Sequence, residues 1–386
     1  MSENVKPVLH TCTRCVLDTK DVPYLTFNSE GVCSCCQRYD YWYAHTPRGV
    51  EAEKLLARTV EQIKKEGAGK TYDCIVGLSG GVDSTYVAYQ AKKHGLRPLA
   101  VHFDNGWNSE LSVKNIENII SRLGFDLYTY VINWEEFRDL QLSYLKASVI
   151  DIEAITDHAI FGSLFRLAAK HKTKWILSGN NLSTEGILPY HWIWNKSDST
   201  NIKDIHRQFG SVKLKTFPFT NFTSKWFHKK ILKIRTFEIL DLMPYIKKDV
   251  KALIQKELGW RDYGGKHYES IWTRFYQGYI LPTKFGIDKR KAHVSSLICS
   301  GQMTREEALL ELQKPMYDPE QYQIDKTFVL KKFGLSTAEF DALMTAPVRS
   351  HKDFRHQGMA LYHRIPFLKP LKPLGDMVKG MRAKQK

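Results

Sequence analysis

The sequence predicts an α/β protein with a parallel sheet, a small cysteine-rich unit before the sheet and a mainly helical portion after it. Apolar runs alternate with amphipathic stretches between residues 72 and 178, and strands separated by helices pair in parallel with helices on both faces. Most of the seven cysteines lie before residue 40. After residue 181 the alternation fades, and helical patterns follow one another.

The elements can be placed in order along the chain. Residues 50–66 combine apolar spacing with many charges, which predicts an amphipathic linker helix. Short apolar runs bounded by turn residues predict strands, and longer stretches with helical spacing predict helices. The expected strands span 72–78, 97–103, 125–132 and 174–178, and the further expected helices span 85–94, 109–123, 134–150, 156–170, 247–258, 268–279, 288–299 and 305–313. Thr304 with Glu307, and Ser336 with Glu339, are capping-box pairs that mark helix starts.

The most distinctive motif is the hexapeptide Ser-Gly-Gly-Val-Asp-Ser over residues 79–84, between the first strand and the helix that follows it. Gly80 and Gly81 can adopt backbone angles that a side chain would forbid. Their amides and the helix N-terminus can point at one anion, and Ser79 and Ser84 add hydroxyl donors. Asp83 would repel phosphate by itself, so we expect it to hold a bridging Mg2+. The motif therefore predicts a phosphate-binding loop.

The hexapeptide differs from two common nucleotide-binding loops. A Walker A loop needs Gly-Lys-Ser/Thr, and a dinucleotide fingerprint needs GxGxxG after the strand. The pattern instead resembles SGGxDS, the PP-loop of the N-type ATP pyrophosphatases, which cut ATP into AMP and pyrophosphate. This resemblance implies an adenine nucleotide alpha-hydrolase-like, Rossmann-like domain with ATP as co-substrate; the alternative is an ordinary strand-turn-helix corner. The ATP contacts that it implies come from Ser79, Gly80, Gly81, Val82, Asp83 and Ser84.

The other strand ends should meet this loop, because ligands of parallel sheets bind beyond the carboxyl ends of the strands. In the PP-loop enzymes that the chain resembles, the end of the second strand embraces adenine, which implies contacts from Val101, His102 and Phe103. A glycine-containing turn after the fourth strand implies a ribose or phosphate contact at Gly179. Asp104 could bind metal or substrate, or could simply form a turn.

The cysteines predict a structural metal site. Cys12 with Cys15, and Cys33 with Cys36, form two Cys-x-x-Cys turns around a short predicted hairpin, the layout of a zinc ribbon. Four thiolates make a closed tetrahedral zinc site, which supplies folding energy to a unit too small for a core of its own. An iron–sulfur cluster or a redox pair are the alternatives, and Cys35 is a spare thiol that could replace a neighbour.

Composition limits the class of partner. The 386 residues carry a net charge of +16, from 57 Lys and Arg against 41 Asp and Glu, which suggests a nucleotide-sugar, an acidic protein, an anionic membrane surface or nucleic acid. The charge is spread along the chain, so nucleic acid is not favoured. No apolar run is long enough to span a bilayer and no signal-peptide core begins the chain, which predicts a cytoplasmic protein.

Three longer motifs narrow the resemblance. They are SGNNLSTEG over residues 178–186, RDYGGKHYES over 261–270 and KFGIDKRKAH over 284–293. With the zinc ribbon ahead of the loop, they look like the N-acetyl sugar amidotransferase family, to which the WbpG and PseA proteins of bacterial surface-polysaccharide synthesis belong. The resemblance runs from about Cys12 to about Leu312.

The resemblance implies a reaction and a partner. The acetamido group of a sugar or nucleotide-sugar would become an acetamidino group in lipopolysaccharide, O-antigen or nonulosonic acid synthesis. The amide oxygen would attack the α-phosphate of ATP, releasing pyrophosphate and forming an adenylyl imidate from which ammonia displaces AMP. Ammonia would come from a separate glutaminase subunit like that of imidazole-glycerol-phosphate synthase, often with a cyclase-like third subunit.

This chemistry needs cations, because charge builds on the phosphates as pyrophosphate leaves. Lys284, Lys289 and Arg290 are the catalytic candidates beside Asp83, although each could belong to a solvated helix face. His267 could shuttle a proton or be a surface histidine. The full set of substrate-binding candidates is Asp104, Asn180, Asn181, Glu185 and His267.

We expect five segments: a zinc ribbon over 1–45, a linker helix over 46–70, a PP-loop core over 71–200, a helical substrate or partner portion over 201–345 and a basic tail over 346–386. Two other functions remain open. Some tRNA thiolation enzymes also place zinc knuckles before a PP-loop, but Cys74 and Cys299 are the only cysteines outside the ribbon here. A non-catalytic zinc-ribbon scaffold is the second alternative.

Overall fold

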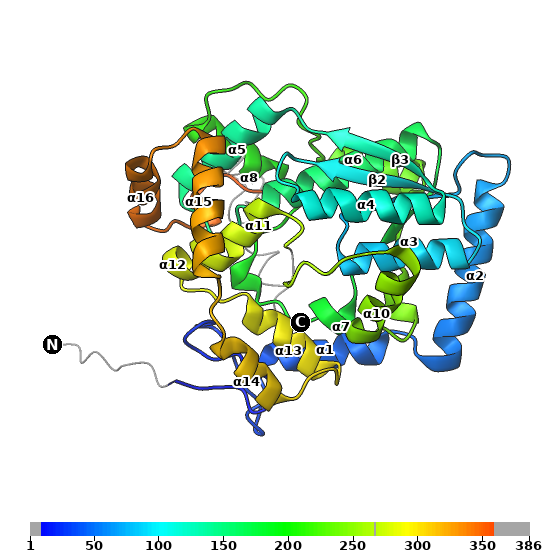
Figure 1. Ribbon diagram of the computed structural model, residues 1–386, viewed down its shortest axis with the longest axis horizontal. Helices are drawn as coiled ribbons and strands as arrows, with labels where there is room; N and C mark the ends of the chain where they lie inside the picture. The colour runs from blue at the N-terminus through cyan, green and yellow to red at the C-terminus, as the bar shows by residue number, and fades with distance from the viewer. Residues whose placement is uncertain (1–8, 266–267, 359–386) are drawn as a thin grey trace, which may run out of the picture.

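The computed structural model describes residues 9–265 and 268–358. Its centre is a parallel sheet in the order β3-β2-β1-β4-β5, with helices on both faces (Figure 1). The predicted parallel α/β architecture is confirmed. The strands are β1 (Cys74–Gly77), β2 (Pro98–Asp104), β3 (Asp126–Val131), β4 (Trp175–Ser178) and β5 (Arg235–Glu238).

The edge strand β5 is one that the sequence analysis did not expect. It pairs with β4 from Trp175 opposite Arg235 to Ser178 opposite Glu238. The sheet therefore extends past residue 200, where we expected the core to end. β5 escaped prediction because it is short and contains one large apolar residue, Phe237, and an edge strand needs fewer apolar residues than a central one.

Each face of the sheet has its own helices. Val76 of β1 belongs to the cluster with four helices on one face, whereas its neighbour Ile75 belongs to the cluster with α6 (Ala154–Lys170) on the other. This alternation follows from the two-residue period of a strand. The four helices are α2 (Gly49–Gly67), α3 (Val82–Lys93), α4 (Glu110–Leu123) and α10 (Lys247–Leu258).

A second core lies beyond the carboxyl edge of the sheet, toward which the arrows of β2 and β3 point in Figure 1. It includes Trp107 and Ile132, which follow the ends of these strands. A π-helical turn, Tyr276–Ile280, joins two of its helices into one run. The helices are α5 (Trp134–Ala147), α8 (Ser199–Phe209), α11 (Ile271–Phe275), α12 (Leu281–Phe285), α15 (Pro319–Phe333) and α16 (Thr337–Thr345).

Both predicted capping boxes are present, at the starts of α14 (Arg305–Gln313) and α16. Part of the segment that we assigned to the tail packs into the second core. Phe354 is buried there, and the Arg355 amide donates to Asp204 of α8 over 3.0 Å. The remainder of that segment, from residue 359, lies outside the described residues.

The cysteine-rich unit packs against the rest of the chain. Its Leu17 and Val22 share a core with Trp192 and with Ala292 in the first turn of α13 (Arg290–Cys299). Lys291 of α13 forms ion pairs with Asp18, at 3.0 Å, and with its neighbour Asp21. The expected hairpin is reduced to isolated bridges, and the second Cys-x-x-Cys turn opens directly into α1 (Ser34–His45). Apolar packing and ion pairs therefore fix the cysteine-rich unit against α13.

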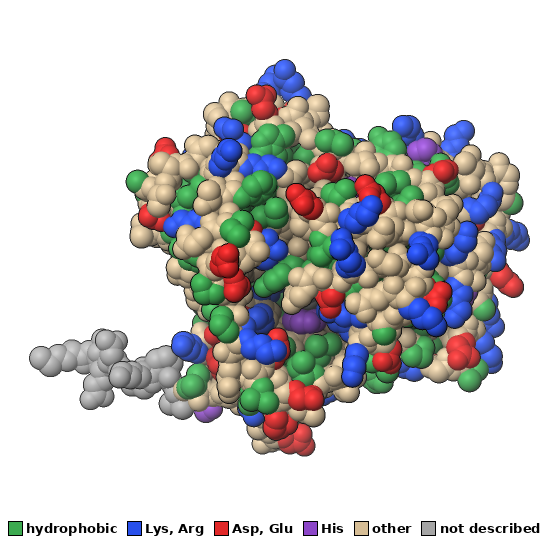
Figure 2. Space-filling view, viewed as in Figure 1, with side chains coloured by type: hydrophobic (Ala, Val, Ile, Leu, Met, Phe, Trp, Pro, Cys, Tyr) green, Lys and Arg blue, Asp and Glu red, His purple; other side chains and the backbone are tan. Residues whose placement is uncertain are grey.

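The surface shows no concentration of charge on the face drawn in Figure 2, where Lys and Arg lie scattered among Asp and Glu. Across the described residues, every helix is too short or too polar to cross a bilayer.

Candidate nucleotide site and metal centre

The hexapeptide forms a tight turn between β1 and α3. Gly80 has a φ of +82°, a conformation that favours glycine. Its carbonyl accepts hydrogen bonds from Trp260 Nε1 at 2.7 Å and from the Tyr263 hydroxyl at 3.0 Å. The Ser79 carbonyl accepts from Ser112 Oγ at 3.2 Å. Residues from α4 and from the segment after α10 thus fix the loop from outside.

The polar groups of the loop converge on its inner side. The hydroxyls of Ser79 and Ser84 are 3.1 Å apart, and the Gly81 amide donates to Ser79 Oγ over 3.2 Å. Gly81 directly precedes α3, so the first amides of that helix lie at the loop. Hydroxyls and amides at a helix N-terminus favour a bound anion. The local structure is the one expected of a phosphate-binding loop.

Asp83 lies in the first turn of α3 and is held from two sides. The Tyr245 hydroxyl makes a short hydrogen bond with Asp83 Oδ1, and Asn181 Nδ2 donates to the same oxygen over 3.3 Å. Burial, reinforced by Asp83 and Glu185, raises the pKa of Tyr245 well above its ordinary value, so this phenol remains a donor. A carboxylate oriented in this way suits Mg2+, which binds proteins through one or two carboxylates together with substrate phosphates.

The turn after β4 contacts the loop directly. A Cβ atom placed on Gly179 would lie 3.2 Å from the Ser84 amide nitrogen, so the two backbones approach closely. Asn181 Oδ1 accepts from the Thr184 amide over 2.8 Å and caps α7 (Leu182–Glu185). Asn180 is exposed beside it. The structure thus brings Gly179 and Asn181 to the loop as the sequence analysis expected, while their ligand contacts, and the substrate contact expected of Glu185, stay predictions.

The end of β2 lies beside the loop, but its side chains are engaged within the protein. His102 is buried, with Nδ1 at 3.0 Å from the Leu78 carbonyl and Nε2 at 2.9 Å from Asn108 Nδ2. The Val101 carbonyl accepts from the Leu78 amide, and half-buried Phe103 stacks on a tyrosine of β3. An adenine contact from this strand end would therefore use the backbone or the Phe103 ring.

Asp104 occupies the turn-forming position that the sequence analysis gave as the alternative to a ligand role. Its Oδ1 accepts from the Gly106 amide at 2.8 Å and from Asn108 Nδ2 at 3.1 Å. These bonds fix the turn after β2.

The predicted cations take structural positions. Lys284 donates to the Ala346 carbonyl at 2.9 Å and to the Leu343 carbonyl at 2.5 Å, and so caps the end of α16. Arg290 pairs with Asp288 at 2.8 Å and donates to backbone carbonyls at the C-terminal end of α14. Lys289 is half-buried at the start of α13. Within residues 9–265 and 268–358, no hydrogen bond or ion pair joins these three side chains to the loop. His267 lies outside the described residues.

Glu269 is a loop neighbour that the sequence analysis missed. A Cβ atom on Gly81 would lie 3.3 Å from Glu269 Oε1. Burial, with the Glu269 carboxylate nearby, raises the pKa of Tyr263 to about 12. The Glu269 carbonyl accepts from the Ser109 amide at 2.9 Å, which ties this segment to the turn before α4. The signal was present, because Glu269 lies in one of the motifs that carried the resemblance.

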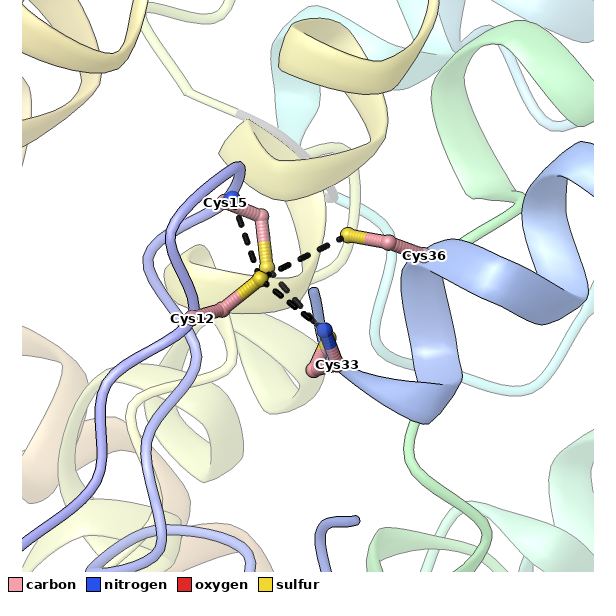
Figure 3. A group of neighbouring side chains, drawn as sticks. All are labelled: Cys12, Cys15, Cys33 and Cys36. Carbon is pink, nitrogen blue, oxygen red and sulfur yellow. Dashed lines mark hydrogen bonds between the residues drawn. The ribbon is translucent and has the colours of Figure 1, made fainter. Parts of the chain in front are cut away.

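The four predicted cysteine ligands form one buried cluster, and their sulfurs point toward one another in Figure 3. All four sulfurs lie within 4.8 Å of one another; Cys15 and Cys33 are 3.7 Å apart and Cys12 and Cys36 are 4.0 Å apart. Zinc–sulfur bonds of about 2.3 Å in a tetrahedron separate the sulfurs by roughly 3.8 Å. The Cys15 and Cys33 amides also donate to Cys12 Sγ. The donor set and its spacing therefore fit zinc.

Of the two remaining nearby thiols, Cys35 is the spare thiol that the sequence analysis expected, whereas the position of Cys299 was not expected. Cys35 lies outside the cluster, and its sulfur accepts from Arg38 over 3.9 Å. Cys299, which the sequence placed alone in a helical region, has its Sγ only 3.6 Å from Cys36 Sγ. The fold brings the end of α13 to the metal centre, a long-range contact that spacing along the chain could not indicate.

Comparison with known proteins gives two family matches. Residues 269–369 match the C-terminal domain of the LPS biosynthesis protein WbpG-like family. Residues 73–164 match the family of the queuosine biosynthesis protein QueC. The first match begins at Glu269, and the second contains the whole hexapeptide.

Two curated proteins are also similar. An uncharacterized protein of Methanocaldococcus jannaschii is 24% identical over 321 residues, covering 81% of this chain and 96% of that protein. The tRNA(Ile)-lysidine synthase of Chlamydia pneumoniae is 36% identical over 70 residues, covering 18% of this chain and 22% of that enzyme.

Two solved structures show only distant likeness. The NH3-dependent NAD synthetase of Campylobacter jejuni has a TM-score of 0.30 at 14% identity, covering 74% of this chain and 98% of that one. The NMN synthetase of Francisella tularensis has a TM-score of 0.31 at 15% identity, covering 73% and 96%. Scores this low carry no argument about the site.

Proposed function

Because this chain is a PP-loop protein with a WbpG-like C-terminal domain, we propose that it is the synthetase half of an ATP-dependent amidotransferase. It would convert the acetamido group of a sugar or nucleotide-sugar into an acetamidino group and release AMP and pyrophosphate. This is carbon–nitrogen ligase chemistry, and its setting would be bacterial surface-polysaccharide synthesis.

One observation carries this proposal. The loop of the ATP-binding domain is in contact with Glu269, where the WbpG-like match begins. Tyr263 and Trp260, just before that match, hold the Gly80 carbonyl. A substrate held by the C-terminal domain would therefore lie next to the phosphates of ATP. Positioning an amide oxygen against the α-phosphate is what the first step requires.

The residues of the loop have distinct roles in this proposal. The Gly81 amide and the hydroxyls of Ser79 and Ser84 would bind the phosphates and stabilise the charge that develops on departing pyrophosphate. Asp83 would hold Mg2+, which when bound neutralises phosphate charge. The bonds from Tyr245 and Asn181 orient the Asp83 carboxylate before ATP arrives.

The attacking amide oxygen and the later ammonia need separate access to the crevice. The first step joins the amide oxygen to the α-phosphate, breaks the bond to pyrophosphate and releases the amide N–H proton. In the second step ammonia adds to the imidate carbon, loses a proton and expels AMP. Glu269 is the carboxylate beside the loop that could accept this proton. Ammonia would come from a glutaminase subunit. Zinc would have a structural role and would hold the cysteine-rich unit against α13.

The cysteine positions argue against thiolation of tRNA. Cys74 is fully buried at the start of β1, at the edge of the sheet opposite the loop. Cys299 lies at the metal centre. A cysteine that carried a persulfide or bound an iron–sulfur cluster for thiolation would have to lie at the loop. Among the described residues, no cysteine lies there.

A position-specific oxygen label tests the proposal. The acetamido oxygen of a candidate nucleotide-sugar would be replaced by a heavy isotope, and the enzyme supplied with Mg-ATP and ammonium chloride. We expect the label in the phosphate of AMP and none in pyrophosphate, because the amide oxygen stays on the leaving AMP. Turnover with unlabelled AMP would exclude the adenylyl imidate.

A further inference from the structure

The stretch over residues 205–237 is unusual in its charge, because it contains cations and not one Asp or Glu. The cations of this stretch are Arg207, Lys213, Lys215, Lys225, Lys229, Lys230, Lys233 and Arg235. Glu66 of α2 neutralises Arg235 at 2.5 Å and Asp204 of α8 neutralises Arg207 at 2.7 Å, which leaves the lysines to define the charge of the surface.

The same stretch presents large apolar side chains to solvent. Phe222–Trp226 (α9) continues through a π-helical turn to Ile231, giving one helical run over 222–231. Phe222 is 77% exposed, Trp226 51%, Phe227 47% and Ile231 52%. Single exposed apolar residues are common, but four within one short helical run form a patch. Phe222, Trp226 and Phe227 also line a shallow hollow in the surface.

The run has an anchored side and a free side. His228 stacks on Phe165 of α6, with ring centroids 5.7 Å apart, and faces the body of the protein. On the outer side, exposed Lys229 and Lys230 lie between the exposed aromatic residues and Ile231. The outer side therefore combines positive charge with apolar surface that no described element covers.

The position of the run separates it from the nucleotide site. The Ile234 amide donates to the His228 carbonyl at 2.9 Å, and the Arg235 amide donates to the Lys174 carbonyl at 2.8 Å. The run therefore leads into β5 at the amino edge of the sheet, whereas the loop over residues 79–84 lies at the carboxyl edge. A partner seated on the run leaves the crevice open. A position away from the crevice favours a partner that anchors the enzyme. A subunit that delivers ammonia would instead have to bind close to the crevice.

We propose that the helical run over residues 222–231 docks the protein on the anionic face of a phospholipid bilayer. Aromatic and aliphatic side chains gain free energy at the boundary between headgroups and acyl chains, and lysines beside them attract anionic headgroups. Tryptophan is favoured at that depth. The absence of acidic side chains from the stretch removes the repulsion that would oppose such contact. The helix lies in the interface and does not cross it.

Vesicle co-sedimentation with the full chain tests the proposal. The probes are vesicles of phosphatidylcholine alone and of phosphatidylcholine mixed with phosphatidylglycerol. We expect binding to the mixed vesicles only, weakened by salt. Trp226→Ala and the pair Lys229→Glu with Lys230→Glu should each weaken binding by at least about tenfold.

Matched variants elsewhere separate a specific surface from general charge or stickiness. Trp42→Ala removes a tryptophan of α1 that is 53% exposed. Lys64→Glu with Lys65→Glu changes two adjacent exposed lysines of α2 and alters the net charge by the same amount as the test pair. Both controls should bind vesicles as the parent does. Unfolding midpoints and zinc content show that each variant is folded.

Three results would overturn the proposal. The first is no binding to mixed vesicles by the folded parent. The second is equal weakening by the test and control variants. The third is tight binding of single-stranded oligouridylate that Trp226→Ala abolishes while vesicle binding is unaffected, since exposed aromatic and basic residues also bind single-stranded nucleic acid.

Discussion

Replacing Gly80 with alanine is the sharpest single test of the loop. The residue has a φ of +82°, and a non-glycine residue in the left-handed region is destabilised by about 1–2 kcal/mol. A Cβ atom there would also lie 2.9 Å from the Tyr263 hydroxyl and 3.2 Å from the Ser112 carbonyl. Such crowding typically adds about 1–3 kcal/mol. We therefore expect Gly80→Ala to lower the free energy of unfolding by about 2–5 kcal/mol.

A matched control isolates the crowding. Gly301 has a φ of +71°, and a Cβ atom on it meets nothing within 4 Å. Gly301→Ala should therefore show only the conformational part, about 1–2 kcal/mol. Urea unfolding of both variants measures the difference. If the two variants lose the same free energy, the close packing around Gly80 is not as described.

The same variant tests function. Relief of the crowding must move the loop away from Tyr263 or Ser112, which shifts the Gly81 amide and the two serine hydroxyls relative to one another. We expect Mg-ATP binding, measured by calorimetry below the unfolding transition, to weaken by at least about tenfold. Gly301→Ala should bind Mg-ATP as the parent does. Parental affinity in folded Gly80→Ala would refute the assignment of this loop to ATP.

Three other predictions concern single residues. Asp83→Asn should abolish pyrophosphate release while zinc stays bound, because it removes the carboxylate proposed for Mg2+; parental turnover would rule out that role. Cys12→Ser should release zinc, measured by metal analysis, and lower stability; full zinc occupancy would contradict the four-cysteine site. Burial lowers the pKa of His158 to about 4, so its unfolded form binds a proton more readily below about pH 6.5. Stability should therefore fall as the pH drops from 6.5 toward 4, by about 2 kcal/mol from this residue at pH 5, and the fall should be shallower in His158→Gln; an identical slope in that variant would exclude His158 as a cause.

The fold was predictable where burial forces a strong local pattern. The central strands β1 and β4 are buried on both faces, so their sequences are short apolar runs. The edge strand β5 is half exposed, and the few buried residues of α15 include the charged Asp325, which weakens its apolar pattern. Such elements are specified by their neighbours in space more than by their own sequence.

The candidate site shows the same division. The hexapeptide and the four cysteines are local motifs whose spacing fixes their geometry, and both take the expected form. That a residue belongs to a motif does not show where its side chain points. Lys284, in the motif over residues 284–293, caps α16, whereas Glu269, in the motif over 261–270, reaches the loop. Tyr245 and Cys299 reach their sites through contacts between segments distant in the sequence. These contacts arise only when the helices pack.

The most direct test of the proposed function is a product assay by mass spectrometry. The purified protein would receive Mg-ATP, ammonium chloride at mildly alkaline pH and a panel of acetamido nucleotide-sugars, so that free ammonia replaces the glutaminase. The proposal predicts AMP, pyrophosphate and a sugar in which one oxygen has become NH. ATP turnover that responds to tRNA and leaves every acetamido sugar unchanged would contradict it.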